Sequence, residues 1–333
     1  IRLSLVGSEM CIRDRMRTLY TRLLLQKGQF DAAKQQAERL NNQYPDDHNL
    51  LFYLAVLMLE HEQITLSEAY FNQLVKQFGA NSTLHYYLGR IAEHKQQPDA
   101  ALQHFLQIDD SPYLIAGLSE IGKLLNQASD ETQLRQIYQQ KRGKHADQSA
   151  LLFALEASWL ADKDRPLLAL EVYSEALTEH PDNTQLLYNR AMLSEQLDQL
   201  EQMEQDLKRL LTIDPDNATA LNALGYSLTN RTDRHPEALT LIRKALNLKP
   251  DDPAILDSMG WVHYQLGDYP LALQYLLRAY ESFPDPEIAS HLGMVYWKLG
   301  QPDNARKIWS EALQRDPDNR LILDTMQQAE QTR

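Results

Sequence analysis

Apolar residues recur along most of the chain at intervals of three and four positions, the spacing that gives an α-helix one apolar stripe. Short polar turns that contain proline separate the helical stretches. Five of these prolines follow one another at intervals of about 34 residues: Pro181, Pro215, Pro250, Pro284 and Pro317. No segment has a convincing strand pattern, so the sequence predicts an all-helical chain of repeated helix pairs.

Small residues recur with the same period. Glycine or alanine at the crossing of two helices lets the two backbones approach closely. One such position is held by Ala157, Ala191, Gly225, Gly260 and Gly293, and a second by Ala176, Ala245, Ala279 and Ala312. Gly267 and Gly300 follow the first helix of a pair, where a residue in the left-handed conformation can end the helix without steric cost.

The period and these positions resemble the tetratricopeptide repeat. The resemblance is best in two units, which contain Leu256, Met259, Gly260, His263, Gly267, Ala272, Leu276, Ala279 and Pro284, then Leu292, Gly293, Tyr296, Gly300, Ala305, Trp309, Ala312 and Pro317. It implies an all-α fold, a right-handed superhelical solenoid of about nine helix pairs with a C-terminal capping helix. No single pair would be stable alone, so the stack must supply the stability.

The clarity of the repeat divides the chain. Residues 148–318 hold well-formed repeats, whereas residues 16–147 hold degenerate ones, weakest at 47–81 and 111–147. Residues 319–333 are predicted to form the capping helix, with Leu321, Ile322, Leu323 and Met326 on one side and polar residues elsewhere.

The first 15 residues are interpreted separately. The run from Leu5 to Arg15 back-translates in one frame onto a sequencing-library transposon adapter, so we interpret residues 1–15 as a non-native remnant, with a natural tail as the alternative. Cys11, the only cysteine, lies in this run, which removes disulfides and thiolate metal sites from the expected chemistry. The natural start would then be missing, so the absence of a signal peptide or lipidated cysteine says nothing about export.

Composition and charge argue against some partners. With 43% hydrophobic and 24% charged residues, the chain has the composition of an ordered protein. Its net charge of -13 argues against nucleic acid, because nucleic-acid affinity comes mainly from lysine and arginine neutralising phosphates. No apolar run approaches the roughly 18 to 20 residues that span a bilayer.

Motifs that carry chemistry are not found in the sequence. There is no glycine-rich phosphate loop, no HExxH or paired-ligand spacing among the 10 histidines, and no GxSxG nucleophile signature. His263 occupies a core position of the repeat, so we expect it to be packed rather than a metal ligand. The sequence therefore predicts no enzyme, no catalytic residues, no cofactor and no metal. A cryptic site in the irregular stretch 111–147 is the remaining enzymatic alternative.

The family resemblance implies that the first helix of each pair lines a concave groove. Carried over unit by unit, the groove positions are Tyr86, Arg90, Tyr188, Met192, Asn222, Tyr226, Asp257, Trp261, Tyr264, Met294 and Trp297. Aromatic residues, methionine and arginine are enriched at protein interfaces, so this set predicts a binding groove. The alternative is that Trp261 and Trp297 only fill space between adjacent first helices.

The Lys/Asn clamp of some eukaryotic chaperone adaptors would place lysine and asparagine at two fixed groove positions. Those positions hold Asn222 and Tyr226 in one unit, and Asp257 and Trp261 in the next, so a partner gripped by its C-terminal carboxylate is not expected.

The runs at 222–234, 252–267 and 284–293 resemble those of bacterial outer-membrane tetratricopeptide lipoproteins of the LbcA type. The specific match covers roughly the last 120 residues. It implies a periplasmic adaptor, anchored by a lipid on a cysteine beyond this sequence, that binds a PDZ-containing carboxyl-terminal processing protease and its peptidoglycan-hydrolase substrates. An assembly or chaperone-like adaptor for outer-membrane or polysaccharide-export machinery is the alternative.

Overall fold

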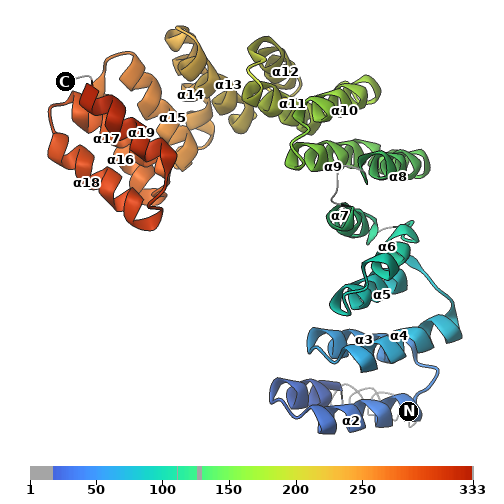
Figure 1. Cartoon of the computed structure of the whole chain (residues 1–333). Coiled ribbons are helices and arrows are strands. Elements are labelled where there is room, and N and C mark those ends of the chain that lie inside the picture. Colours follow the sequence, from blue (N-terminus) through green and yellow to red (C-terminus); the bar gives the residue numbers. More distant parts are fainter. Residues whose placement is uncertain (1–17, 111, 126–129, 332–333) are drawn as a thin grey trace, which may run out of the picture. The chain divides into compact units, whose positions relative to one another are not determined.

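The computed structural model describes residues 18–110, 112–125 and 130–331, and the predicted remnant at 1–15 lies outside them. Throughout these ranges the regular elements are helices, as predicted (Figure 1). Contacts between Cα atoms divide the chain into two compact units, Ile1–Leu155 and Glu156–Arg333, with the boundary inside α9 (Ser149–Asp162). Each unit is described by itself.

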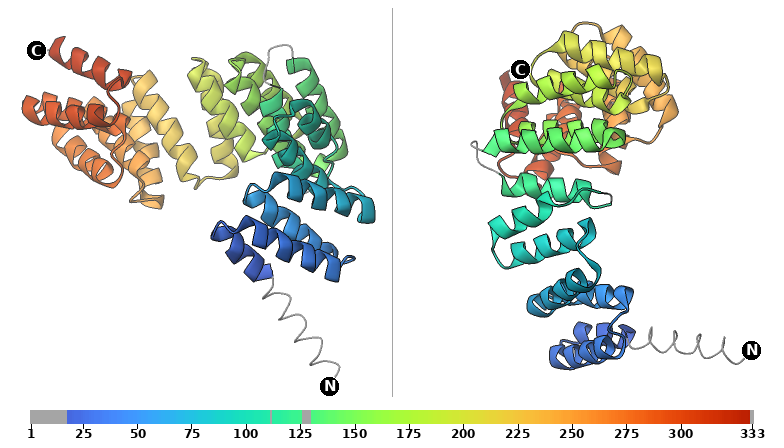
Figure 2. Two further views of the ribbon diagram at one scale, coloured as in Figure 1. Left: turned by 60° about the horizontal axis from the view of Figure 1, so that its bottom comes forward. Right: turned by 90° about the vertical axis from the view of Figure 1, so that its right-hand side faces the viewer.

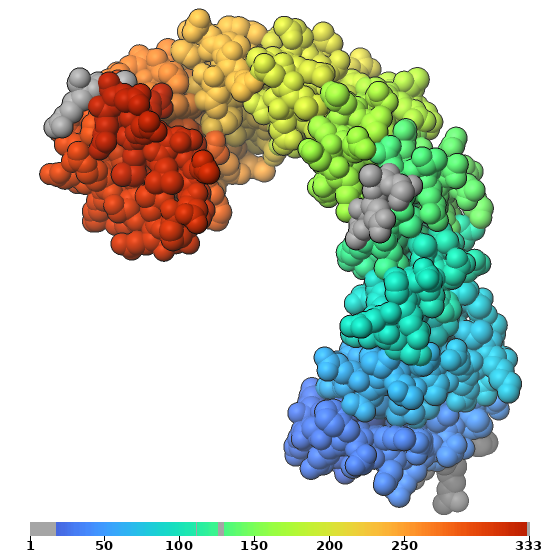
Figure 3. Space-filling model, viewed as in Figure 1, coloured from blue at the N-terminus to red at the C-terminus, as the bar shows by residue number. Residues whose placement is uncertain are grey.

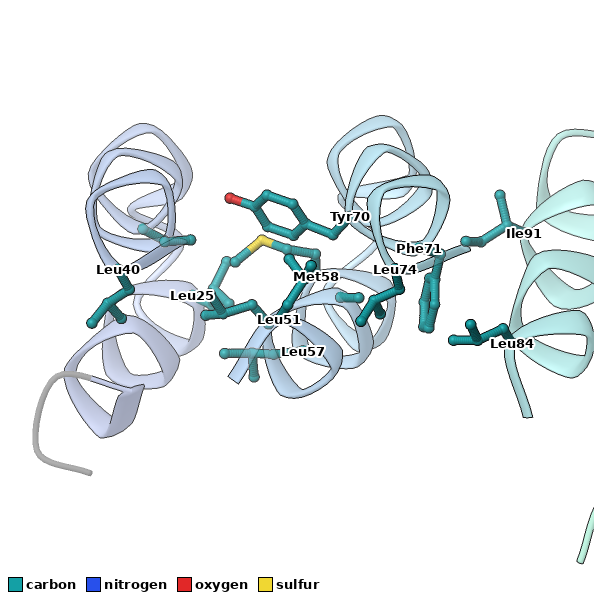
Figure 4. Close-up of a cluster of buried hydrophobic side chains, with 14 of the residues drawn as sticks. Leu25, Leu40, Leu51, Leu57, Met58, Tyr70, Phe71, Leu74, Leu84 and Ile91 are labelled. Carbon is teal, nitrogen blue, oxygen red and sulfur yellow. The ribbon is translucent and has the colours of Figure 1, made fainter. Parts of the chain in front are cut away.

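The first unit begins with a helix over residues 18–26. It continues with α2 (Phe30–Gln43), α3 (His48–Glu60), α4 (Ile64–Phe78), α5 (Ser82–His94), α6 (Pro98–Leu106), α7 (Leu114–Leu124), α8 (Glu131–Lys144) and the 3-10 turn η2 (Ala146–Gln148). Side chains from the helix at 18–26 through α5 meet in one apolar core, in which Met58, Phe71 and Leu74 are fully buried (Figure 4).

The second unit contains α10 (Pro166–Glu179), α11 (Thr184–Gln196), α12 (Leu200–Ile213), α13 (Ala218–Arg231), α14 (His235–Leu248), α15 (Pro253–Gln265), α16 (Tyr269–Ser282), α17 (Pro286–Lys298), α18 (Pro302–Arg315) and α19 (Arg320–Gln331). Consecutive helices pair as α11/α12, α13/α14, α15/α16 and α17/α18 (Figure 2). The pairs stack through α14/α15 and α16/α17, and the first helices α13, α15 and α17 also contact one another in order. In the space-filling view the stacked helices of this unit leave no break between one pair and the next (Figure 3).

Local sequence sets where the helices of the second unit begin. The first helices follow an asparagine or aspartate whose side chain accepts a backbone N–H of the first turn: Asn183, Asn217, Asp252 and Asp285. Second helices such as α10 and α18 begin with proline. The backbone N–H at the first helical position has no partner within the helix, so nothing is lost by using proline, which has no N–H.

Glycine ends two of the first helices as predicted. Gly267 and Gly300 have φ angles of 82° and 72° and follow α15 and α17. Asp164 and Asp198, after α9 and α11, take the same left-handed conformation with φ near 59° and 60°. A Cβ atom makes that conformation cost roughly 1–2 kcal/mol, so glycine is the better residue at this turn.

The repeated small residues lie where the helices of a pair cross. A Cβ atom on Gly260 would lie 2.5 Å from Cγ of Leu276, and one on Gly293 would overlap the Trp309 ring. Leu276 and Trp309 are almost completely buried, and each contributes about 1.5–3 kcal/mol through the hydrophobic effect. His263 is packed as predicted, with its ring stacked 5.9 Å from that of Tyr275.

The degenerate stretch at 47–81 keeps the helix pair but changes the small residues. Ala55 of α3 and Ser67 of α4 are both fully buried where the two helices meet. The Ser67 hydroxyl donates to the carbonyl of Ala55 at 2.8 Å, so a polar residue replaces the expected alanine without leaving an unpaired group.

The stretch 111–147 contains α7 and α8. The repeat motif is missing here, and contacts of a buried lysine, Lys141, hold the helices instead. Lys141 Nζ donates to the carbonyl oxygen of Ile108 at 2.5 Å and to Asp109 Oδ1 at 2.9 Å. Burial alone would raise the pKa of Asp109, but hydrogen bonds from Lys144 and Lys141 outweigh it and lower the pKa to about 2. These contacts join α8 to the end of α6.

The prediction of which residues form the apolar face of the C-terminal helix is partly wrong. Ile322, Thr325 and Ala329 of α19 are buried, whereas Leu321 and Leu323 are 46% and 42% exposed. Three consecutive residues cannot share one helical face, because each residue turns the helix by about 100°. The buried positions follow the three- and four-residue spacing, and α19 packs on α17 and α18. None of the described helices is long and apolar enough to cross a membrane.

Candidate protein-binding surface on the first helices of the second unit

Trp261 on α15 lies at the centre of a cluster formed by three first helices. Its indole Nε1 donates to Asn230 Oδ1 of α13 at 2.6 Å. Its ring stacks on Tyr264, with centroids 4.6 Å apart, and on His291 of α17, with centroids 4.0 Å apart. The two interpretations of Trp261 are therefore compatible: it fills space between first helices and the residue is still partly exposed.

Two polar contacts cross from helix to helix beside Trp261. The buried carboxylate of Asp257 accepts from His291 Nδ1, with distances of 2.9 and 3.0 Å to its two oxygens. The hydroxyl of Tyr226 on α13 donates to Glu287 Oε1 on α17. Burial, then the neighbouring Glu287 charge, raises the pKa of Tyr226 above its usual value, so the phenol remains a proton donor.

A pocket of about 340 Å³ opens beside these contacts. This volume is near the lower end of the range of roughly 300–1,000 Å³ that is typical of small-molecule sites. The pocket is lined by Asn222 and Tyr226 of α13, by Pro253, Ala254, Asp257 and Ser258 of α15, and by Phe283, Asp285, Glu287 and Ile288 at the start of α17.

The structure brings together five of the predicted groove residues. Asn222, Tyr226 and Asp257 line the pocket, and Trp261 and Tyr264 extend the cluster along α15. The sequence did not indicate the other wall of the pocket. The one signal in the sequence is that Phe283 is an aromatic residue in a polar turn, and in the structure it is 56% exposed.

Of the two predicted residues of α17, Met294 is buried and Trp297 is partly exposed. Met294 is 8% exposed and lies in the apolar core, which leaves little of its surface for a partner. Trp297 packs against Trp309 of α18, with ring centroids 6.1 Å apart, and Arg306 lies over its ring at 5.4 Å. These contacts lie within one helix pair, so they differ from the alternative in which Trp297 fills space between adjacent first helices.

The remaining predicted residues do not line the pocket. Tyr188 and Met192 lie on α11 and are partly exposed. Burial raises the pKa of Tyr188. In the first unit, Tyr86 stacks on Tyr113 with centroids 4.6 Å apart, and Arg90 Nη1 donates to the Tyr86 hydroxyl at 3.4 Å.

The chemistry of the cluster suits binding. Its polar groups form hydrogen bonds that link α13, α15 and α17, and aromatic rings supply contact area. In the described part of the chain, no three histidine, cysteine, aspartate or glutamate side chains gather in a way that could hold a metal ion.

Known proteins share both the sequence pattern and the fold. Tetratricopeptide repeat models match residues 58–114, 184–217, 216–285 and 258–320, which together cover more than half of the chain. The TPR repeat-containing protein PA4667 of Pseudomonas aeruginosa is 41% identical over 63% of this chain and 35% of its own length. The BBSome complex member BBS4 of Bos taurus is 25% identical over 46% of this chain and 36% of its own. The chain thus spans about a third of the length of these relatives.

Two solved structures are similar in fold. A tetratricopeptide repeat protein from Parabacteroides merdae has a TM-score of 0.54 at 15% identity, over 75% of this chain and 98% of that one. A chain in the crystal structure of the APC/C hetero-tetramer Cut9–Hcn1 has a TM-score of 0.52 at 16% identity, over 94% of this chain and 62% of that one. At these identities the likeness concerns the fold alone. Together with the helix pairs and their period, the matches show that the chain belongs to the tetratricopeptide repeat proteins.

Proposed function

We propose that the chain is a scaffold that binds other proteins through the surface formed by α13, α15 and α17 and performs no chemistry itself. The observation that carries the proposal is the convergence of Tyr226, Trp261 and Tyr264, all partly exposed, beside a pocket on contacting helices. Aromatic side chains are enriched at protein interfaces, where a few residues supply most of the binding energy. Protein binding is also the role that tetratricopeptide repeats as a class perform.

The finer role we propose is that of an adaptor in the bacterial envelope. It would bind a carboxyl-terminal processing protease with a PDZ domain and the peptidoglycan hydrolases that this protease degrades. It would lie in the periplasm, held at the outer membrane by a lipid on a cysteine beyond this sequence. The support is the resemblance of the runs at 222–234, 252–267 and 284–293 to LbcA-type lipoproteins, together with the 41% identity to the Pseudomonas aeruginosa repeat protein. Holding protease and substrate on one scaffold raises their effective concentration.

A capture experiment tests this role. The chain is immobilised and exposed to a Gram-negative envelope extract, beside a Tyr264→Ala, Phe283→Ala variant that removes one partly exposed and one exposed ring from the surface. The matched control is Leu167→Ala, Glu175→Ala on α10, since Leu167 is 62% exposed and Glu175 is also exposed. Circular dichroism verifies that both variants fold, and mass spectrometry identifies the captured proteins.

We expect the wild type and the α10 control to capture a processing protease or a cell-wall hydrolase, and the Tyr264→Ala, Phe283→Ala variant to lose it. Equal capture by all three proteins would mean that the surface is not the binding site. Capture of components of an outer-membrane or polysaccharide-export machine, without protease or hydrolase, would replace the protease role with that of an assembly adaptor.

A further inference from the structure

The pocket between α13, α15 and α17 is lined by three carboxylates, while the hydroxyl groups in its lining already donate elsewhere. Two of its donors are already engaged: the Tyr226 hydroxyl donates to Glu287, and the Ser258 hydroxyl donates to the carbonyl of Ala254 at 2.9 Å. By contrast, Oδ1 of Asn222 is buried without a hydrogen-bond partner. A buried acceptor without a partner costs about 1–3 kcal/mol, so a guest that donates to it would gain binding energy.

The helix starts at the rim of the pocket do not restore donors. Helix N-termini usually attract anions through free N–H groups. Here α15 and α17 begin with Pro253 and Pro286, which have no N–H. The next N–H groups donate to the capping carboxylates, from Ala254 to Asp252 at 3.1 Å and from Glu287 to Asp285 at 2.8 Å. An anionic guest would therefore find few partners at this rim.

The charge of the lining has one sign. Asp257, Asp285 and Glu287 are carboxylates, and none of the ten lining residues is lysine, arginine or histidine. Asp257 is paired with His291, so Asp285 and Glu287 supply most of the negative potential at the opening. A cation is the guest that this potential favours.

Part of the lining is apolar. Ala254, Phe283 and Ile288 contribute hydrocarbon surface beside the carboxylates. Lysine and arginine side chains combine an apolar stem with a cationic end that carries several N–H donors, which is the combination that such a pocket accommodates.

We propose that this pocket binds a lysine or arginine side chain of the partner protein. The stem lies against Phe283 and Ile288, and the cationic end donates to the carboxylates of Asp285 and Glu287. A rotation of the Asn222 amide toward the guest lets the same cationic end also donate to Asn222 Oδ1. The proposal rests on the scaffold function, and it adds that the partner presents an exposed basic residue at the centre of the interface. A partner recognised by a basic side chain also agrees with the groove sequence, because the positions of the Lys/Asn clamp, which grips a C-terminal carboxylate, hold other residues here.

The test uses small probes with the full chain. N-acetyl-arginine-N-methylamide is titrated into the ¹⁵N-labelled protein, beside its neutral isostere N-acetyl-citrulline-N-methylamide. The readout is the Trp261 indole N–H signal, assigned with a Trp261→Phe variant, because Trp261 stacks on the histidine that pairs with Asp257. The corresponding lysine and norleucine compounds form a second pair that differs in charge.

We expect the arginine probe to bind about tenfold more tightly than the citrulline probe, and the lysine probe to bind more tightly than the norleucine probe. Glu287→Gln keeps the acceptor for Tyr226 but removes a charge, and should weaken arginine binding about fivefold. Asn222→Ala removes the unpaired acceptor and should also weaken it. Asp303→Asn, at a fully exposed carboxylate on α18, is the matched control and should have no effect.

Equal affinities for the arginine and citrulline probes would overturn the proposal, as would equal effects of Glu287→Gln and Asp303→Asn. The result is independent of the capture experiment. If a protease or hydrolase is captured but the arginine and citrulline probes bind equally well, the scaffold function stands and the proposed binding of a basic side chain is wrong. If the probe binds but neither protein class is captured, the pocket stands and the envelope role is wrong.

Discussion

Gly293 lies where α17 crosses α18, and the ring of Trp309 fills the space that a side chain would need. Gly293→Ala would force the indole or the helix to move. We expect the variant to lower the free energy of unfolding of the second unit by about 1–3 kcal/mol, the usual cost of overpacking. Urea unfolding followed by tryptophan fluorescence measures this, because all four tryptophans of the chain lie in the second unit.

Ser310→Ala is the control for that substitution. Ser310 is exposed on α18, so the change should alter stability by no more than about 0.5 kcal/mol. Coincident unfolding curves for Gly293→Ala and Ser310→Ala would contradict the close packing of Gly293 on Trp309.

Single residues also show what the sequence could and could not predict. The crossing glycines were predictable because close approach of two helices restricts the residue at one fixed position in every repeat. The hydrogen bond from Tyr226 to Glu287 was not, because it joins residues two repeats apart and depends on how neighbouring pairs stack. The pocket wall at Phe283 and Asp285 was missed for the same reason, since those residues are turn positions in one repeat and become lining only in the stack.

Among the helices, the repeat was predictable where its small residues are present. The pairs from α11 to α18 follow the 34-residue period, whereas α3, α4, α7 and α8 depart from the motif because other contacts replace it. Ser67 bonds to a backbone carbonyl, and Lys141 joins α8 to the end of α6. Such substitutions preserve packing but leave no regular pattern to recognise.

The contact between α5 and α6 should depend on pH. His85 Nδ1 lies 3.2 Å from His104 Nδ1, so at least one ring must be neutral for the two to share a proton. Burial lowers the pKa of both below 6.5, and the charge of His85 lowers that of His104 further. Below about pH 6.5 the unfolded chain then binds protons that the folded helices resist, so stability present at higher pH is lost as pH falls.

Hydrogen exchange of peptides from α5 and α6 measures this loss. Between pH 7.5 and pH 5, after correction for intrinsic exchange rates, we expect protection to fall in the wild type. A His85→Gln, His104→Gln variant, compared at the same pH values, should lose less protection because neither glutamine titrates. The same pH dependence in both proteins would mean that the histidine pair is not its source.

At the scale of the whole molecule, 46 acidic residues exceed 33 basic ones, and the resulting field should act on any charged ligand. Raising NaCl from 20 to 300 mM shortens the Debye length from roughly 20 Å to below 10 Å, so distant carboxylates stop contributing. We expect the affinity for N-acetyl-arginine-N-methylamide to fall roughly twofold to fivefold, and that for the citrulline compound to stay constant. Glu287→Gln should lower the arginine affinity at both salt concentrations yet retain most of the salt dependence, because it removes only one of many negative charges. If that variant instead abolished the salt dependence, the attraction would come from the pocket alone, and the net charge of -13 would have no part in selecting a basic partner.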